Sequence, residues 1–364
     1  MTRLRMAVIG VGHLGKEHAR ILAGLPEVDL VGVADVNFDQ AEAVARRFGC
    51  QAFANQRPLL PLIDAAVIAV PTSQHHTLAG ECLRWGIALL VEKPLACTLE
   101  QAEDLVELAR RQRLVLQVGH IERFNPAYEE LRRHNFQPKF IECERLGPFT
   151  GRSTDIGVVL DLMIHDLDLL LTLSPAPVRS VEALGVSVFG GHEDVANARI
   201  SFANGCVANV TASRASRAPQ RKMRIWSPEG YAGVEFAKRR LTLIQPSAEL
   251  RRHGLDTGKL APASRGVLRA ELFGRYLQVL ERDCSTGSDS LTRELKHFVY
   301  CARTGSRPRV SGDDGRDAIA LASRILESIH RHPWEGSPGG PTGPMQLPAP
   351  QGIFFGPTVD GLAA

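Results

Sequence analysis

Three side chains of the chain are of types that together can remove a proton from an alcohol. Lys93 lies within Glu-Lys-Pro at positions 92–94, directly after the apolar run 87–91. Asp161 and His165 are spaced i,i+4 in a second apolar segment, so on a helix they share one face. A lysine can polarise a hydroxyl or stabilise an alkoxide, while a histidine that a carboxylate orients can accept the hydroxyl proton. Proton transfer from an alcohol is therefore the first chemistry to consider.

Each of these groups also has a plainer interpretation. Lys93 can be an ordinary surface lysine at the end of a strand. His165 can be a core histidine, or it can bind a metal together with Asp161, although the sequence offers no further ligands. We favour proton transfer, with Asp161 orienting the imidazole, and expect no metal site. Asp168 falls near the same stripe of the helix, whereas Asp166 points toward another element.

A glycine-rich segment near the N-terminus predicts where a cofactor binds. Residues 8–15 read Val-Ile-Gly-Val-Gly-His-Leu-Gly, between an apolar run of strand length and a segment of helical periodicity at 13–23. Gly10 permits a tight turn, Gly12 lets the backbone approach a pyrophosphate, and Gly15 allows the helix to pack closely on the strand. The N-terminus of that helix offers N–H groups to the phosphates. Strand, turn and helix together predict a dinucleotide site.

An acidic residue supports the same prediction and bears on the identity of the cofactor. Asp35 ends the next apolar run, twenty residues beyond Gly15, where a carboxylate accepts hydrogen bonds from the adenosine ribose and favours NAD over NADP. The alternative is that Asp35 caps a helix beginning near Asp39. The residues expected at the cofactor are Gly10, Gly12, His13, Leu14, Gly15, Asp35, Pro71, His75, Glu92 and Lys93.

The elements that must position these groups alternate along the first third of the chain. Beyond the glycine turn, helices are predicted at 39–48, 73–85 and 99–112, and strands at 64–70, 87–91 and 114–119. Strands that alternate with helices form a parallel, doubly wound sheet of the Rossmann type. In such sheets ligands bind beyond the carboxyl ends of the strands, which is where Pro71, Lys93 and His120 fall.

The pattern changes from about Pro138. One apolar helix at 158–173 is followed by strand-like stretches at 178–188, 196–202, 206–213 and 223–226, and, after a polar stretch, by helices at 292–303 and 314–329. This predicts a C-terminal α/β domain with a largely antiparallel open sheet. We expect a nucleotide-binding domain at residues 1–122, a substrate and oligomerisation domain at 123–335, and a Gly/Pro-rich disordered tail at 336–364.

The composition excludes several classes of partner. Lys plus Arg number 43 against 40 for Asp plus Glu, and this net charge of +3 is too small to indicate nucleic acid or a membrane. No apolar stretch is long enough to span a bilayer and no signal segment precedes the first strand, so a soluble cytoplasmic protein is expected. The seven cysteines are scattered without a Cys-x-x-Cys pair, which argues against disulfides and zinc.

Polar residues at the junction of the two predicted domains are candidates for substrate binding. Arg123 and Asn125 can contact hydroxyls or a phosphate, although His120 and Glu122 can equally pair with each other across the hinge. A basic run follows at Arg214, Arg217, Arg221, Lys222 and Arg224. Such a run is usually a solvated or subunit-contact surface, but it can also meet an anionic substrate. The substrate residues that we predict are Arg123, Asn125 and Arg217.

Taken in order, the glycine motif, Pro71-x-x-x-His75, Glu92-Lys93-Pro94 and Asp161-x-x-x-His165 resemble the pattern of the Gfo/Idh/MocA oxidoreductases over residues 4–331. The resemblance implies a Rossmann domain followed by an α/β domain whose open sheet commonly mediates oligomers. It implies that Lys93, Asp161 and His165 are the catalytic residues. Many members have Gly midway between the Asp and the His, whereas this chain has Met163, which predicts a bulkier pocket wall.

Within that family, residues 119–126 and 159–166 look most similar to the branch that contains UDP-N-acetylglucosamine 3-dehydrogenases. The resemblance implies an NAD-dependent oxidation of a secondary hydroxyl of a sugar, with a nucleotide sugar as the expected substrate and a homo-oligomer, dimer or tetramer, as the expected assembly. A free sugar or inositol is the alternative substrate. A cofactor-binding regulator without turnover and a metal-dependent hydrolase are the alternative classes of protein.

Overall fold

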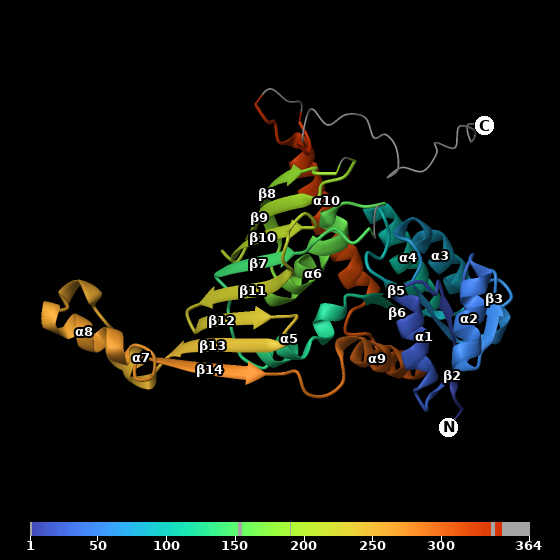
Figure 1. The fold of residues 1–364 in the computed structure, drawn as a ribbon, viewed down its shortest axis with the longest axis horizontal. Helices are drawn as coiled ribbons and strands as arrows, with labels where there is room; N and C mark the ends of the chain where they lie inside the picture. Colours follow the sequence, from blue (N-terminus) through green and yellow to red (C-terminus); the bar gives the residue numbers. More distant parts are fainter. Residues whose placement is uncertain (1, 152–154, 190, 336–338, 344–364) are drawn as a thin grey trace.

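Two β-sheets, one in each half of the chain, set the positions of the candidate residues (Figure 1). The protein is seen here as a computed structural model that describes residues 2–151, 155–189, 191–335 and 339–343. The first sheet has six parallel strands in the order β3-β2-β1-β4-β5-β6. These are β1 (Leu4–Ile9), β2 (Val28–Ala34), β3 (Gln51–Phe53), β4 (Ala65–Ile68), β5 (Ala88–Glu92) and β6 (Leu116–Gly119).

Helices cover both faces of the first sheet, which is why its central strands are apolar throughout. One face is covered by α1 (Gly15–Ala23), α2 (Phe38–Phe48) and α9 (Ser290–Thr304), and the other by α3 (His75–Arg84), α4 (Leu99–Gln112) and the first half of α10 (Gly312–Arg331). Every residue of β4 and β5 is buried. The predicted doubly wound parallel sheet is confirmed. The prediction missed β3, whose three residues are exposed or only partly buried.

The second sheet has eight strands in the order β14-β13-β12-β11-β7-β10-β9-β8. They are β7 (Phe140–Leu146), β8 (Val178–Val186), β9 (Val195–Phe202), β10 (Val207–Ser213), β11 (Gln220–Ser227), β12 (Gly230–Glu235), β13 (Arg240–Pro246) and β14 (Leu277–Asp283). Only β7 and β10 run parallel, so the predicted largely antiparallel sheet is confirmed.

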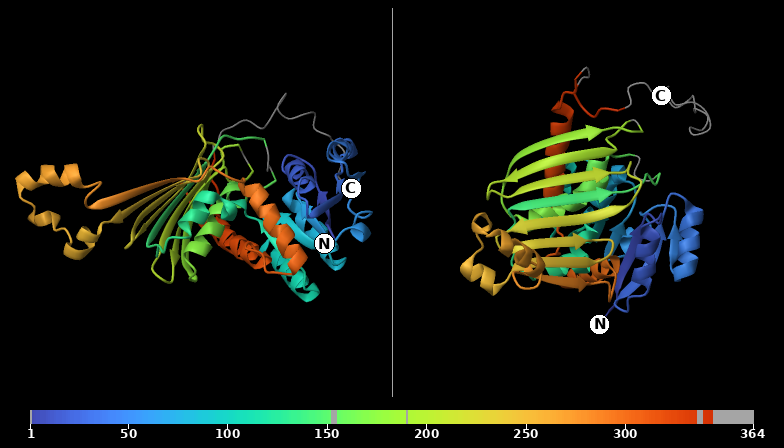
Figure 2. Two further views of the ribbon diagram at one scale, coloured as in Figure 1. Left: turned by 90° about the horizontal axis from the view of Figure 1, so that it is seen from below. Right: turned by 60° about the vertical axis from the view of Figure 1, so that its left-hand side comes forward.

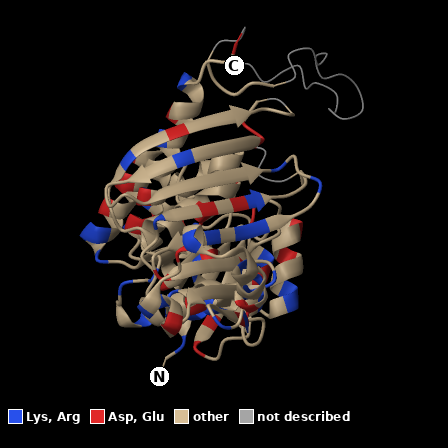
Figure 3. Cartoon of the chain, turned by 90° about the vertical axis from the view of Figure 1, so that its left-hand side faces the viewer, with Lys and Arg blue, Asp and Glu red and all other residues tan. Residues whose placement is uncertain are grey.

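Helices cover only one face of the second sheet. The helices α5 (Pro126–Leu131), α6 (Ile164–Leu173) and the second half of α10 pack against it there. The opposite face is seen in the right-hand view of Figure 2, where most of its strands carry no helix. Basic and acidic residues occur along several of these strands (Figure 3). The open face predicted for this sheet is therefore present.

The two C-terminal helices join the two halves of the chain. Helix α9 contributes Leu295 and Phe298 to the core of the first sheet. Helix α10 contributes Ile319 to that core and Ile325 to the core of the second sheet. A division of the chain at residue 123 therefore separates the two sheets but not the helices that cover them.

A projection of about thirty residues extends from the hairpin of β13 and β14 (Figures 1 and 2). It contains α7 (Ala248–His253) and α8 (Pro262–Glu271), neither of which has a buried residue. Of the tail predicted to be disordered, only residues 339–343 are described, and the rest lies outside the described residues. Among the helices that the structure describes, none is long and apolar enough to cross a bilayer.

Candidate active site

A cavity of about 740 Å³ lies between residues of the two halves of the chain. One side is lined by the glycine turn and by residues that follow β4 and β5, and the other by residues of α6 and of the ends of β7 and β11. The predicted residues that line it are His13, Leu14, Pro71, Lys93, Asp161 and His165. Its size is that of a small-molecule site.

The glycine turn has the geometry that a dinucleotide needs. Gly10 has a φ of +85°, and a Cβ there would lie 2.6 Å from the carbonyl oxygen of Ala69. A Cβ on Gly15 would lie 1.8 Å from the carbonyl oxygen of Gly10, so the helix packs too closely for any side chain. At Gly12 nothing lies within 4 Å of the corresponding position, which leaves the backbone open to a pyrophosphate. These residues fit a nicotinamide dinucleotide at the N-terminus of α1.

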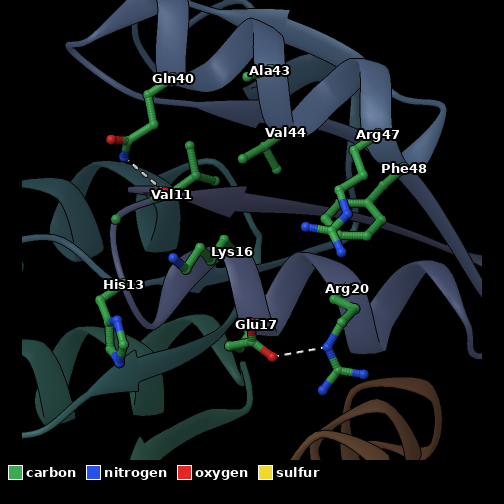
Figure 4. A pocket seen from close by; sticks show the side chains of 11 residues that line it. Val11, His13, Lys16, Glu17, Arg20, Gln40, Ala43, Val44, Arg47 and Phe48 are labelled. Atoms are coloured by element: carbon green, nitrogen blue, oxygen red, sulfur yellow. Dashed lines mark hydrogen bonds and ion pairs between the residues drawn. The ribbon is translucent and has the colours of Figure 1, made fainter.

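Asp35 is tied to the glycine turn and not to the helix that follows it. Its carboxylate accepts hydrogen bonds from the N–H of Val11 at 2.8 Å and of Asn37 at 2.9 Å. Helix α2 is capped by Asn37, whose side chain accepts from the N–H of Gln40, so the alternative of Asp35 as a helix cap is wrong. Gln40 also donates to the carbonyl of Val11 (Figure 4). The carboxylate lies beside the turn, as a ribose contact requires.

Lys93 connects the two halves of the chain at the cavity. It follows β5 and is joined to Pro94 by a cis peptide bond. Its Nζ donates to Oδ1 of Asp161 at 2.9 Å and to the backbone carbonyl of Asp161 at 2.6 Å. Only 14% of the Lys93 side chain and 18% of the Asp161 side chain are exposed. The lysine charge is therefore held at the cavity wall, where it can stabilise an alkoxide.

A π-turn, η4 (Val159–Met163), explains why Asp161 faces the lysine. In this turn the N–H of Ile164 donates to the carbonyl of Val159, five residues back. The wider turn breaks the i,i+4 stack, and no hydrogen bond between Asp161 and His165 is found among the described residues. The prediction that Asp161 orients His165 is therefore wrong.

The same turn overturns a second expectation. Met163 is fully buried in the core of the second sheet and does not line the cavity. The neighbouring Leu162 lines it instead. The predicted bulkier wall at Met163 is therefore not found, because the turn directs that side chain into the core.

His165 lies at the start of α6 and lines the cavity. Burial and, after it, the ammonium group of Lys93 lower the pKa of His165 well below its usual range. The ring is therefore neutral at pH 7 and can accept a proton. Its Nδ1 is buried and has no hydrogen-bond partner within the described part of the chain, which leaves Nε2 as the nitrogen that can serve the cavity.

Two of the predicted cofactor residues lie behind the cavity wall. His75 is buried, and its ring nitrogens lie 2.9 Å from the carbonyl oxygen of Val70 and 2.8 Å from that of Pro94. Glu92 is buried too, and its carboxylate is hydrogen-bonded to Nε2 of His18 at 2.7 Å. These contacts tie the end of β5 to the loop after β4 and to α1. His75 and Glu92 thus hold the residues that line the cavity.

The structure does not bring the predicted substrate residues Arg123 and Asn125 into the cavity. The guanidinium group of Arg123 forms a buried ion pair with Asp168, with both hydrogen bonds at 2.7 Å. Asn125 donates to Glu122 at 3.0 Å, and its own side-chain oxygen caps α5. These polar residues of the domain junction therefore make their hydrogen bonds and ion pairs with other residues of the junction. The interpretation of Arg123 and Asn125 as substrate ligands is corrected accordingly.

Arg217 also lies outside the cavity, and two other arginines line it. Arg217 is exposed, whereas Arg145 and Arg221 are lining residues. Arg221 of β11 lies directly opposite Arg145 of β7, so both point to the same face of the sheet. Arg145 is neutralised by Asp166 and Glu122 at 2.9 and 3.0 Å, so Glu122 does not pair with a histidine. For the side chain of Arg221 no hydrogen bond or ion pair is found among residues 2–151, 155–189, 191–335 and 339–343.

Both missed arginines carried a weak signal. Arg221 belongs to the basic run, but which of its members face the cavity depends on a strand register that the sequence does not reveal. Arg145 lies in Phe-Ile-Glu-Cys-Glu-Arg-Leu at 140–146, whose alternation is that of a half-buried strand. Arg145 takes an inward-facing position in that alternation, which predicts a buried charge that needs ion-pair partners.

Comparison with known proteins agrees with the geometry. The model of the oxidoreductase family with an NAD-binding Rossmann fold matches residues 4–120, and that of the GFO/IDH/MocA C-terminal domain matches residues 130–232. UDP-N-acetylglucosamine 3-dehydrogenase of Acidithiobacillus ferrooxidans is 43% identical over 249 residues, which are 68% of this chain and 79% of that enzyme. The chain belongs to the Gfo/Idh/MocA oxidoreductases.

More distant members of the family and solved structures extend the comparison. The scyllo-inositol 2-dehydrogenase (NAD(+)) of Bacillus subtilis is 27% identical over 331 residues, 86% of this oxidoreductase and 90% of that enzyme. A solved structure of the A. ferrooxidans enzyme has a TM-score of 0.78 at 35% identity and covers 90% of this chain and 98% of that one. Levoglucosan dehydrogenase with NADH and levoglucosan has a TM-score of 0.73 at 19% identity, which shows a shared fold. The chain is a nicotinamide-dependent dehydrogenase that acts on CH–OH groups.

Proposed function

We propose that this oxidoreductase oxidises a secondary hydroxyl of a nucleotide sugar, with UDP-N-acetylglucosamine as the first candidate and its 3-hydroxyl as the group oxidised. The observation that carries the proposal is one cavity lined by Lys93, a neutral His165 and Arg221. The first two side chains suit a secondary alcohol, and the third suits a diphosphate. The activity named for the A. ferrooxidans relative supports the same substrate.

The proposed mechanism divides the work between the two side chains nearest the alcohol. A bound nicotinamide dinucleotide supplies the hydride acceptor. His165 accepts the hydroxyl proton at Nε2, because burial and the Lys93 charge hold its pKa low and the ring neutral. Lys93 stabilises the alkoxide, and Asp161 keeps the lysine in position through two contacts. Asp161 thus acts through the lysine.

Arg221 is the residue that we propose for the diphosphate. The charge of its neighbour Arg145 is already balanced by carboxylates, whereas that of Arg221 is available. Arg214, a third lining arginine, is held by Asp194 at 2.6 Å. Arg221 belongs to β11 of the second sheet, whereas Lys93 follows β5 of the first, which suits a substrate whose phosphates and sugar are bound by different elements.

A panel of alcohols tests the proposal. The protein is incubated with NAD and, separately, with UDP-N-acetylglucosamine, UDP-glucose, N-acetylglucosamine and myo-inositol, and formation of the reduced cofactor is followed by absorbance. We expect kcat/KM for UDP-N-acetylglucosamine to exceed that for the free sugar by about 10- to 100-fold, the value of one charge-assisted contact. Preferred oxidation of myo-inositol would favour the free-polyol alternative. Binding of NAD without reduction by any alcohol would favour the regulator.

We propose NAD as the preferred cofactor. The Asp35 carboxylate beside the turn would repel the 2′-phosphate of NADP. A groove of about 410 Å³ between α1 and α2 is lined by Lys16, Arg20 and Arg47 (Figure 4). These cations attract a phosphate and so oppose Asp35, which is why the effect of Asp35 on the choice between NAD and NADP needs a direct measurement. We expect Asp35→Ser to reduce the preference for NAD by at least about 10-fold. Asp39→Ser, an exposed acid in the first turn of α2, is the matched control.

We also propose that the chain works as a homo-oligomer, dimer or tetramer, through the open face of the second sheet. Phe140, Trp226 and Tyr231 form an aromatic row on it, with ring centroids 5.2 and 5.5 Å apart. Arg224 balances Glu144 beside them. A broad, aromatic and charge-balanced surface is typical of an interface. A mass of one chain, measured by light scattering at micromolar concentration, would contradict this assembly.

All seven cysteines are free thiols, which suits a reducing cytoplasm.

A further inference from the structure

The residue that orients His165 is not Asp161, so another group must do so. His165 Nδ1 is buried without a hydrogen-bond partner among the described residues, and both ring nitrogens of His120 are in the same state. The two rings face each other edge-on, with centroids 6.3 Å apart and an interplanar angle of 88°. Three unpaired imidazole nitrogens therefore lie in one small region behind the cavity.

Unpaired polar atoms in a protein interior are costly unless water or a neighbour pairs with them. The centroid separation is too large for a direct hydrogen bond between the rings. One water molecule with two hydrogen bonds of about 2.8–3.0 Å each spans such a separation, and buried waters bind where several polar atoms converge. The two histidines supply that convergence, since each ring nitrogen can donate or accept.

The surroundings of His120 keep both rings neutral. His120 follows β6 and is 1% exposed. The charged groups that face it are Asp168 of α6, Arg123 of η3 (Ile121–Phe124), Lys93 after β5 and Asp314 of α10. Burial lowers the pKa of His120, the Asp168 carboxylate opposes that change, and the Arg123 and Lys93 cations add to it. In the neutral state each ring has one N–H and one lone pair, so the water that pairs with His120 can accept the Nδ1–H of His165.

We propose that His120 positions His165 through one bridging water, and that this bridge keeps the proton of neutral His165 on Nδ1. Nε2 then carries the lone pair that accepts the hydroxyl proton. Without a partner at Nδ1, the ring would populate both tautomers, and only one of them is a base at the cavity. The part of this inference that concerns turnover rests on the proposed function. The part that concerns the tautomer does not.

Nitrogen-15 spectra of histidine-labelled protein, recorded without substrate, test the tautomer directly. Shifts of the two His165 ring nitrogens report which one carries the proton. We expect Nδ1–H in the unmodified protein, a mixture of tautomers in His120→Phe, and recovery of Nδ1–H in His120→Gln, whose amide can still hold a water. His297→Phe, at a partly buried histidine next to the ring of Phe124, is the control. An unchanged His165 tautomer in His120→Phe overturns the proposal.

Turnover of UDP-N-acetylglucosamine with NAD adds a second readout. We expect His120→Phe to lower kcat by about 10- to 100-fold, the usual effect of removing the partner of a functional imidazole, with KM within about twofold. His120→Gln should restore most of the loss, and the low-pH limb of kcat should move between the two variants. A uniform loss with an unchanged pH profile, or equal loss in both variants, would mean that His120 only fills space. Failure of the proposed function appears instead as absent turnover in the unmodified protein with the tautomer result intact.

Discussion

The two walls of the main cavity are built on different principles. On the wall formed by the first sheet, the polar groups nearest the glycine turn are paired: His75 with a backbone carbonyl, Glu92 with His18 and Asp35 with the turn itself. On the wall formed by α6 and the second sheet, Arg145 and Arg214 are paired, but His165 Nδ1 and the Arg221 side chain have no hydrogen bond or ion pair among the described residues. These hydrogen bonds of the first wall are formed without a ligand, whereas the second wall retains side chains that can still pair with one.

This difference fits the two kinds of ligand. A cofactor of constant shape is best met by a preorganised surface, because no ordering remains to be done when it binds. A substrate that changes charge during the reaction needs groups that are free to give or take a proton or to pair with it. Lys93 is the residue that belongs to both walls, since it follows β5 and contacts Asp161.

Removing the residue shared by both walls should have the largest effect. Lys93→Met removes the charge that stabilises the alkoxide and leaves Asp161 without its lysine, so we expect kcat to fall by about 10³- to 10⁴-fold. The affinity for NAD, measured by calorimetry, should change by less than about threefold because the glycine turn is untouched. Lys139→Met, at an exposed position at the start of β7, is the control. A kcat within tenfold of the unmodified protein would show that the walls work independently.

The next largest effect is expected at His165, the proposed base. His165→Asn should lower kcat by about 10²- to 10³-fold. In the unmodified protein the pKa of His165 is held well below its usual range by burial and by Lys93, so the rate should not fall as the pH is lowered from about 8 to about 6.5. A loss of kcat/KM centred near pH 6.5 would show that the imidazole titrates as an exposed histidine does. His134→Asn, on the surface after α5, is the control.

A smaller effect, confined to substrate binding, is expected at Arg221, the second unpaired side chain of that wall. Arg221→Gln should raise KM for UDP-N-acetylglucosamine by about 10- to 100-fold and leave kcat nearly unchanged, since the guanidinium group contacts the phosphates and not the alcohol. Arg217→Gln removes an exposed arginine from the same basic run and should leave KM unchanged. Equal effects of the two substitutions would point to a diffuse basic surface.

The smallest effect concerns a carboxyl behind the first wall that, like His120, has no hydrogen-bond partner among the described residues. Glu294 of α9 is fully buried, and neither oxygen has a partner among the described residues. Burial, and then the charge of Glu92, raises the pKa of Glu294 well above its usual range. The folded protein therefore keeps a proton that the unfolded chain releases above about pH 4.3, and this costs stability as the pH rises toward the folded pKa.

Glu294→Gln cannot ionise, so it should remove this pH dependence. We expect its Tm, measured by calorimetry, to exceed that of the unmodified protein by about 2–4 °C at pH 8 and by less at pH 5. The same difference at both pH values would show that Glu294 is not protonated in the fold.

The sequence predicted the first sheet well and the second in outline. Alternating strands and helices carry strong periodic signals, so β1, β2, β4, β5 and β6 fell where they were expected. The stretch 230–283 read as polar, because its strands have one open face and its helices bury nothing. Only the pairing of those strands within a sheet identifies them as strands.

In the site, residue types were predictable but some partners were not. The glycine turn, Asp35 and Lys93 were found because each follows a strand, and the carboxyl end of a parallel strand has a fixed place. The π-turn was not foreseeable, since one extra residue in a helical turn leaves no mark on the apolar pattern. Nor was the pairing of Arg123 with Asp168, 45 residues apart, because local spacing says nothing about distant partners.

Helix α10 has a consequence for the cooperativity of the molecule. Its first half packs Ala318 and Ile319 against the first sheet, and its second half packs Ile325 and Ile329 against the second. One continuous helix cannot lose its packing on one sheet without fraying the turns that hold the other. The two halves, which look like separable modules along the sequence, should therefore unfold in one transition. Destabilising the cofactor-binding half should also destabilise the second sheet.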